Sequence, residues 1–164
     1  MFILLDIDGV LNREDQWNRS YPLDDHCITA FANYARNVPD CKIILTSSWR
    51  LGFLAPMSKQ NTPQVRTLER KFRDRGIRVS GRTGDLGSRA REVRLFVRKH
   101  PNEDYIIIDD EPEEYAKADD DIKSHIYVVN AATGFTDGDT AQIYGRSAFG
   151  YEMSKMFDGL KRKK

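Results

Sequence analysis

Residues 2–12 read Phe-Ile-Leu-Leu-Asp-Ile-Asp-Gly-Val-Leu-Asn, and this stretch decides the fold. Its first four residues are all apolar, which predicts a strand that is buried on both faces of a sheet. Two carboxylates, Asp6 and Asp8, follow the strand directly, and Gly9 permits a sharp turn into a flap over residues 10–21. Ligands of open α/β sheets bind beyond the carboxyl ends of the strands. The stretch therefore predicts the first strand of an α/β domain with an acidic site at its end.

Short apolar runs alternate with amphipathic stretches along the rest of the chain, which predicts a parallel sheet covered by helices on both faces. The chain shows no repeat and no long linker, so we expect one domain over residues 1–164. Between the motifs described below there is room for single helices, a flap and loops, but not for a sizeable domain that closes over the site. The expected strands are 42–46, 77–79, 104–109 and 124–129, the expected helices are 24–37, 63–75 and 88–100, and a helical tail is expected over 136–164.

The composition is that of a globular protein with an uneven distribution of charge. The 164 residues are 40% hydrophobic and 31% charged, which suits an ordinary core and excludes wholesale disorder. The net charge is only +1, but residues 50–100 hold 14 Lys and Arg against 4 Asp and Glu, and residues 101–121 hold 1 against 10. The basic block suits an anionic partner and the acidic block suits a cation, although solvated helical faces would explain both equally well.

Cysteine usage and the first residues favour a cytoplasmic protein. Cys27 and Cys41 have neither the spacing of metal ligands nor that of a redox pair, so we expect reduced thiols. The apolar run at the start ends at Asp6, too early for a signal peptide or a membrane span. We therefore expect no membrane partner.

Polar side chains follow three of the expected strands. Asp6 and Asp8 follow the first, Thr46 and Ser47 end the second, and Asp109-Asp110 follows the fourth. Carboxylates crowded at one edge of a sheet repel one another unless a cation joins them. Oxygen ligands without His or Cys indicate Mg²⁺. The alternative, that each Asp only caps a turn or a helix, explains one such residue better than the whole set.

The ordered motifs resemble those of the haloacid dehalogenase (HAD) superfamily. Asp6-Ile7-Asp8-Gly9 is similar to its first motif, Thr46 to its second and Asp109-Asp110 to its fourth. The third motif is usually a Lys; Arg89 at a helix start is our first candidate for it, and Arg91 is the second. Longer matches resemble the small HAD domains of Swiss Army knife RNA repair proteins, and the Asp-Asp segment is similar to the phosphatase half of polynucleotide kinase-phosphatases. These longer matches are Leu5 to Asn12, Thr46 to Arg50, Arg89 to Val93, Ile108 to Glu111 and Gly134 to Thr136.

The resemblance implies a three-layer, Rossmann-like HAD fold with a central parallel five-stranded sheet, the first strand in the middle, and a minimal cap or none. It implies a Mg²⁺-dependent phosphohydrolase in which Asp6 is the nucleophile and Asp8 protonates the leaving group. The remaining roles that it implies are phosphate binding by Thr46, Ser47 and Arg89, and metal binding by Asp6, Asp8, Asp109 and Asp110, with Asp8 contributing its backbone carbonyl.

The substrate is less sharply defined by the sequence. An uncapped site, the basic block and the RNA-repair resemblance favour a phosphate at a nucleic-acid end, in particular a 3′-phosphate. The alternatives are a small-molecule nucleotidase or general phosphatase, and a nucleic-acid-binding module with a silent HAD site. Trp49, Arg50 and Arg91 are possible substrate contacts, and Trp49 is equally well explained as a core residue. A partner protein could supply a kinase or ligase.

Overall fold

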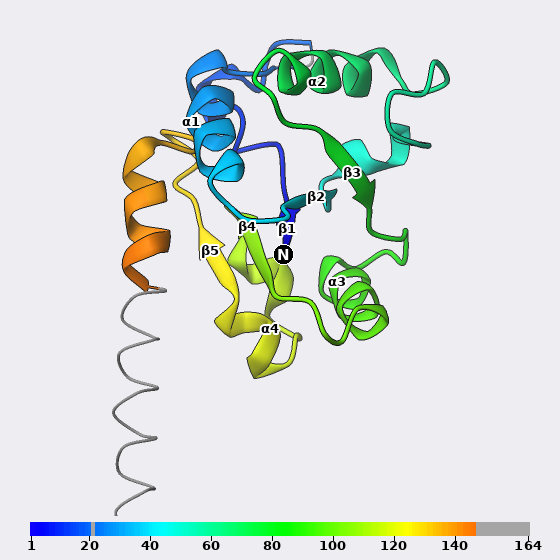
Figure 1. Ribbon diagram of the computed structural model, residues 1–164, viewed down its shortest axis with the longest axis vertical. Helices are drawn as coiled ribbons and strands as arrows, with labels where there is room; N and C mark the ends of the chain where they lie inside the picture. Colours follow the sequence, from blue (N-terminus) through cyan, green and yellow to red (C-terminus); the bar gives the residue numbers. More distant parts are fainter. Residues whose placement is uncertain (21, 147–164) are drawn as a thin grey trace, which may run out of the picture.

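A computed structural model describes residues 1–20 and 22–146. Its strands form one five-stranded sheet in the order β3-β2-β1-β4-β5, in which every pair of neighbours is parallel (Figure 1). This arrangement confirms the predicted α/β, Rossmann-like fold with the first strand in the centre. The strands are β1 (Phe2–Leu5), β2 (Lys42–Leu45), β3 (Val79–Arg82), β4 (Tyr105–Asp109) and β5 (Ile126–Val128).

Helices cover the sheet on both faces, which gives three layers. In Figure 1, α1 (Asp25–Arg36) and α2 (Pro63–Arg73) lie above the sheet, and α3 (Arg89–Lys99) and the short α4 (Asp120–Ser124) lie below it. Three 3-10 helices lie in the connections, and residues 137–146 are helical as well. The 3-10 helices are η1 (Glu14–Gln16), η2 (Ser48–Gly52) and η3 (Pro112–Tyr115).

Successive residues of β1 divide the core between the two faces. Ile3 and Leu5 belong to the cluster that packs under α1 and α2, whereas Phe2 and Leu4 belong to the cluster on the side of α3, η3 and α4. All four side chains are buried, because successive side chains of a strand point to opposite faces and both faces are covered. The unbroken apolar run that opens the sequence is thus explained by its central place in the sheet.

The structure corrects two of the strands that the sequence predicted. Strand β3 begins at Val79, where the sequence predicted 77–79, because Ile77 and Arg78 still belong to the connection from α2. The region 124–129 is divided between the end of α4 and β5. A five-residue helix such as α4 is too short for its periodicity to be read from sequence. Residue 21 of the expected flap and residues 147–164 of the expected tail lie outside the described part of the chain.

The connections across the site are short. Between Asp8 and Thr46 the described residues form η1, α1 and β2, and between Thr46 and Arg89 they form η2, α2 and β3. Within the described residues, neither connection contains an inserted domain that could cover the ends of the strands. No helix in this part of the chain has the length and apolar character needed to cross a membrane.

Candidate active site

Three chain segments meet at the carboxyl edge of the sheet because β1 lies between β2 and β4. The amide of Asp6, just after β1, donates to the carbonyl of Ile108 in β4 at 3.0 Å, and the amide of Thr46, just after β2, donates to Leu5 at 2.9 Å. Asp109 is the last residue of β4. The parallel register therefore brings the polar residues after three strands to one place, as the sequence predicted.

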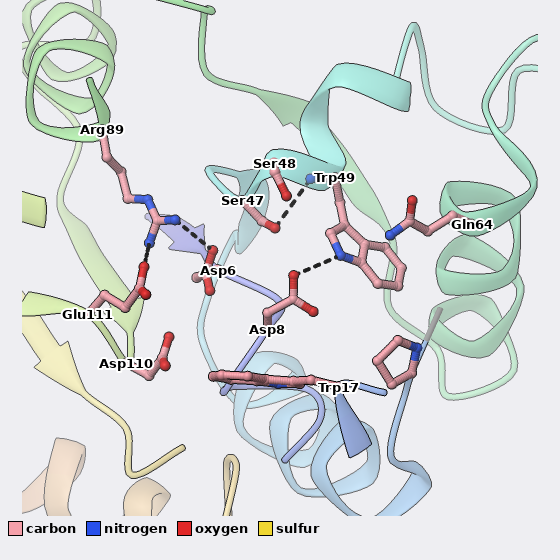
Figure 2. Close-up of a pocket in the computed structure, with 11 residues that line it drawn as sticks. Asp6, Asp8, Trp17, Ser47, Ser48, Trp49, Gln64, Arg89, Asp110 and Glu111 are labelled. Atoms are coloured by element: carbon pink, nitrogen blue, oxygen red, sulfur yellow. Dashed lines mark hydrogen bonds and ion pairs between the residues drawn. The ribbon is translucent and has the colours of Figure 1, made fainter. Parts of the chain in front are cut away.

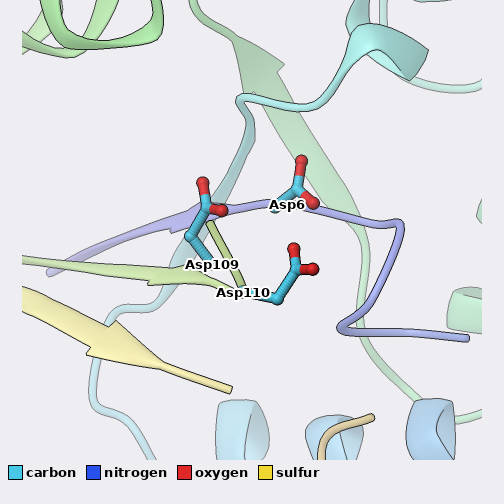
Figure 3. A group of neighbouring side chains, drawn as sticks. All are labelled: Asp6, Asp109 and Asp110. Atoms are coloured by element: carbon cyan, nitrogen blue, oxygen red, sulfur yellow. The ribbon is translucent and has the colours of Figure 1, made fainter. Parts of the chain in front are cut away.

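An acidic cluster forms the floor of the site (Figure 3). One carboxylate oxygen from each of Asp6, Asp109 and Asp110 lies within 4.8 Å of the others. Burial, and then the neighbouring Asp109 carboxylate, raise the pKa of Asp6 well above its ordinary range, and Arg89 opposes this effect only in part. Burial and Asp109 also raise the pKa of Asp110 to about 6. Such crowding disfavours three negative charges unless a cation shares them.

The donor set fits a hard divalent cation. The Oδ1 atom of Asp6 is buried and has no hydrogen-bond donor among the described residues, although Arg89 Nη2 lies 3.5 Å from it. A buried carboxylate oxygen without a donor is costly, and a cation would remove that cost. Oxygen ligands alone favour Mg²⁺ over the softer transition metals. Asp6 and Asp110 can thus hold a metal with Asp109 beside them.

Gly9 allows Asp110 to approach the first motif. Its φ is +74°, and a Cβ at this position would overlap the Asp110 carboxylate. Any other residue would therefore be strained in its backbone and would push Asp110 away. The glycine of the first motif thus shapes the acidic cluster as well as the turn.

Arg89 is the basic residue of the site. As the first residue of α3, it places Nη1 2.9 Å from Oδ1 and 2.7 Å from Oδ2 of Asp109. Figure 2 shows its guanidinium reaching Asp6 and Glu111 along the wall of the cavity. Burial disfavours the charge of Arg89, but Asp6 and Asp109 outweigh it and raise the pKa of the guanidinium. Arg91, the second candidate for this position, is exposed and is not among the residues that line the cavity.

Protein donors contact both carboxylate oxygens of Asp109. Besides Arg89, its Oδ2 accepts from the Tyr115 hydroxyl at 2.8 Å and its Oδ1 accepts from the Glu111 amide at 2.9 Å. A carboxylate has about four lone-pair sites, and three donor groups share those of Asp109, with Arg89 Nη1 in contact with both oxygens. Tyr115 is fully buried, and its hydroxyl holds Asp109 in place.

The Asp8 carboxylate lies between the indole rings of Trp49 and Trp17 (Figure 2). Its Oδ2 accepts from Trp49 Nε1 at 3.1 Å, and its Oδ1 accepts from Asn12 Nδ2 at 2.8 Å. Asn12 is fully buried, and its Oδ1 accepts from Trp17 Nε1 at 2.9 Å. Trp49 is therefore a core residue that also touches the site, so both interpretations left open by the sequence describe it.

The hydroxyl residues after β2 lie at different depths. Ser47 and Ser48 line the cavity, and the Ser47 hydroxyl accepts from the amide of Trp49. Thr46 is fully buried, and its Oγ1 has no hydrogen-bond partner among the described residues. Arg50 turns inward, where it donates to Glu92 at 2.8 Å and to the Thr46 and Ser47 carbonyls, and it does not line the cavity. Arg50 is thus used to brace the turn that carries Thr46 and Ser47.

A cavity of about 470 Å³ opens at the carboxyl edge of the sheet, and Asp6, Asp8, Arg89 and Asp110 are among the residues that line it. Over residues 2–140, the chain matches the family described as the HAD domain in Swiss Army Knife RNA repair proteins. The chain belongs to this family. A comparison with curated proteins gives no match.

Sequence reasoning missed three residues of this HAD domain that hold the site together. Tyr115 could have been suspected, because a buried tyrosine usually finds a partner for its hydroxyl and Asp109 lies six residues before it. The other two are Asn12, whose side chain links Asp8 to the flap, and Trp17 in the flap. Their contacts depend on how the chain folds back after Gly9, which no periodicity reports.

Proposed function

We propose that this chain is a Mg²⁺-dependent phosphohydrolase with Asp6 as the nucleophile. The observation that carries the proposal is the state of Asp6: a buried carboxylate at the end of the central strand, with one oxygen that no donor among the described residues satisfies, beside Asp110 and Arg89. A nucleophile needs a free oxygen pointed at the substrate and a positive environment for the group under attack.

In the first step, a carboxylate oxygen of Asp6 attacks phosphorus, and the bond from phosphorus to the ester oxygen breaks. Asp8 gives its proton to the departing oxygen, so the products are an aspartyl phosphate and an alcohol. In the second step, a water molecule attacks the same phosphorus, and Asp8 takes a proton from that water. The bond to Asp6 then breaks and releases inorganic phosphate.

The remaining residues bind the transferring group. Arg89 faces its oxygens with a charge-assisted contact, and the hydroxyls of Thr46 and Ser47 donate hydrogen bonds to them. Bound Mg²⁺ would neutralise the phosphoryl oxygens and the acidic floor. Asp6 and Asp110 would hold the metal together with the Asp8 backbone carbonyl, and Asp109 would hold Arg89 beside it.

The substrate that we propose is a phosphate at a nucleic-acid end, in particular a 3′-phosphate. Two observations support this substrate. Within the described residues no inserted domain covers the site, and the family is that of the HAD domain in RNA repair proteins. An open site admits a phosphate on the end of a large molecule. A kinase or ligase partner would then act on the same end.

Hydrolysis of p-nitrophenyl phosphate by wild type and Asp6→Asn tests the chemistry. We expect turnover that needs Mg²⁺, stops with chelator and falls by several orders of magnitude in Asp6→Asn, because the substitution removes the nucleophile with little change in volume. Leu95→Ala changes an exposed apolar residue of α3 outside the cavity, and it is the control for effects of substitution and purification that do not involve the site.

A variant Asp6→Asn that keeps more than about a tenth of the wild-type rate, which corresponds to about 1.4 kcal/mol of barrier, would contradict the mechanism. A wild type that releases no phosphate but binds oligonucleotides would instead support a silent site. Oligonucleotides with 3′- or 5′-phosphates, compared with mononucleotides, would then separate end repair from nucleotidase activity.

A further inference from the structure

The cavity has two chemically different halves. Arg89, Asp110 and Glu111 line one half, and in Figure 2 Arg89 and Glu111 lie on the side of Asp6 away from the tryptophans. Trp17, Trp49, Gln64 and Pro22 line the other half, with no charged side chain among them. The first half suits a phosphate. The second half, which we call the aromatic half, suits something planar and uncharged.

Asp8 lies at the boundary of the two halves. It accepts from Trp49 directly, and it is connected to Trp17 through Asn12. In the proposed reaction, Asp8 protonates the oxygen that leaves phosphorus. The group attached to that oxygen must therefore extend past Asp8 toward the aromatic half.

Trp17 offers an open ring face in this half. It is 47% exposed, whereas Trp49 is 4% exposed and is mostly occupied by the core. Its indole N–H is fixed by the fully buried Asn12, so the exposed ring is held in one orientation. A rigid, exposed indole in a cavity binds a flat ligand with little loss of side-chain entropy.

We propose that the aromatic half binds the base of the nucleoside next to the scissile phosphate, and that Trp17 stacks on that base. This inference rests on the proposed function and adds a specificity-determining residue to it. Among the described residues of this half, only Gln64 offers a hydrogen-bonding side chain that makes no hydrogen bond within the protein, so a small polyol would leave most of its hydroxyls unpaired. Every base has a ring face, so stacking of this kind discriminates little between bases.

Isothermal titration in an Asp6→Asn background measures binding without turnover. The ligands are adenosine 3′-monophosphate and inorganic phosphate, both with Mg²⁺. Trp17→Leu should weaken binding of the nucleotide about ten- to one-hundred-fold, the loss expected when one base–aromatic stack is removed. It should leave the affinity for inorganic phosphate within about twofold of that of the Asp6→Asn protein, because that ligand reaches only the half lined by Arg89, Asp110 and Glu111.

Trp17→Phe separates stacking from the hydrogen bond to Asn12. Phenylalanine keeps a ring face but has no N–H, so we expect nucleotide binding within about threefold of the background protein. Leu95→Ala is the matched control, an exposed apolar residue outside the cavity. If Trp17→Phe and Trp17→Leu weaken both ligands alike, Trp17 acts through Asn12 and Asp8, and the stacking proposal is overturned.

Hydrolysis by the wild type keeps the two proposals distinguishable. If wild type hydrolyses adenosine 3′-monophosphate but Trp17→Leu binds it normally, the base site is wrong and the phosphohydrolase stands. If no hydrolysis occurs but binding depends on Trp17, the base site stands and the catalytic proposal is overturned.

Discussion

At the level of single residues, the two neighbouring aspartates after β4 differ more than the sequence suggests. From the sequence, Asp109 is expected to hold the metal more firmly than Asp110, because it is nearer the strand. In the structure, Arg89, Tyr115 and Glu111 use the acceptor sites of Asp109, whereas Asp110 lines the cavity. We therefore propose that Asp109 mainly places Arg89, and that Asp110 is the more accessible ligand for a metal.

Thermal unfolding of Asp110→Asn and Asp109→Asn at increasing Mg²⁺ tests this assignment. Without metal, Asp110→Asn should raise Tm by about 2–4 °C, the shift for about 1 kcal/mol in a domain of this size, because it relieves repulsion in the acidic cluster. Mg²⁺ should then stabilise it less than wild type, because one free carboxylate is lost. Asp109→Asn should keep most of the Mg²⁺-dependent rise. A larger loss of the Mg²⁺-dependent rise in Tm in Asp109→Asn than in Asp110→Asn would identify Asp109 as the main metal ligand.

At the level of elements, the start of α1 connects the helix to the flap. Asp24 caps α1 by accepting from the amides of His26 at 2.8 Å and Cys27 at 3.3 Å. It also accepts from Gln16 of η1 at 2.9 Å. Burial alone would raise the pKa of Asp24, but the hydrogen bonds from Gln16, Cys27 and His26 and the charge of Arg13 lower it. One side chain thus orients both the helix and the flap that carries Trp17.

Asp24→Ala should lower the free energy of unfolding at pH 7 by about 1–2 kcal/mol, the cost of losing an N-cap. Asp24→Asn should cost less, because it keeps an acceptor. The folded pKa lies below the unfolded value of about 3.9, so the charge stabilises the fold above that value, and the stabilisation is lost as the pH falls through the folded pKa. Urea unfolding at pH 7 and pH 3 measures this change.

Asp119→Ala is the matched control for this prediction. Asp119 is the N-cap of α4, but its side chain makes no capping bond, and its ion pair with Arg94 is largely exposed. We expect a cost within about 1 kcal/mol. Equal losses in Asp24→Ala and Asp119→Ala would argue against a special role for the cap of α1.

At the level of the whole molecule, the basic block does not converge on the cavity. Arg66, Arg70 and Arg73 are exposed on α2, and Arg89 is the only Lys or Arg among the described residues that line the cavity. Arg66 also donates to the carbonyls of Lys59 and Asn61, which gives it a structural use. If these arginines serve the substrate, they must contact a long nucleic acid at phosphates away from the reacting one.

Reversal of Arg66, Arg70 and Arg73 to Glu should therefore raise KM for a 3′-phosphorylated oligonucleotide and leave KM for a mononucleotide unchanged. Each lost phosphate contact should reduce the slope of log affinity against log salt by about 0.7–0.9. Reversal of Arg98, Lys99 and Lys117, which are exposed on the opposite layer, is the control for net charge. Equal effects of the two triple variants would identify the three arginines of α2 as a solvated face.

The central strand, the helices around it and the acidic strand ends could be predicted from the sequence. An apolar run such as 2–5 reports burial on two faces, and carboxylates placed directly after such runs must gather at one edge of a parallel sheet. Arg89 was the first of two candidates that the family resemblance suggested, and the structure places it in the cavity wall, whereas Arg91 does not line the cavity. These features depend on neighbours along the chain and on periodicity, which a sequence contains.

The partners of the side chains were decided only by the tertiary structure. Tyr115 holds Asp109, Arg50 turns inward to Glu92, and Trp17 reaches Asn12 because the chain reverses after Gly9. Each choice depends on which donor arrives beside which acceptor when distant segments pack, and a hydrogen bond is made only within a few tenths of an ångström. The sequence by itself therefore determined the sheet and its acidic edge, and packing decided which of those acids are held by protein donors and which line the cavity.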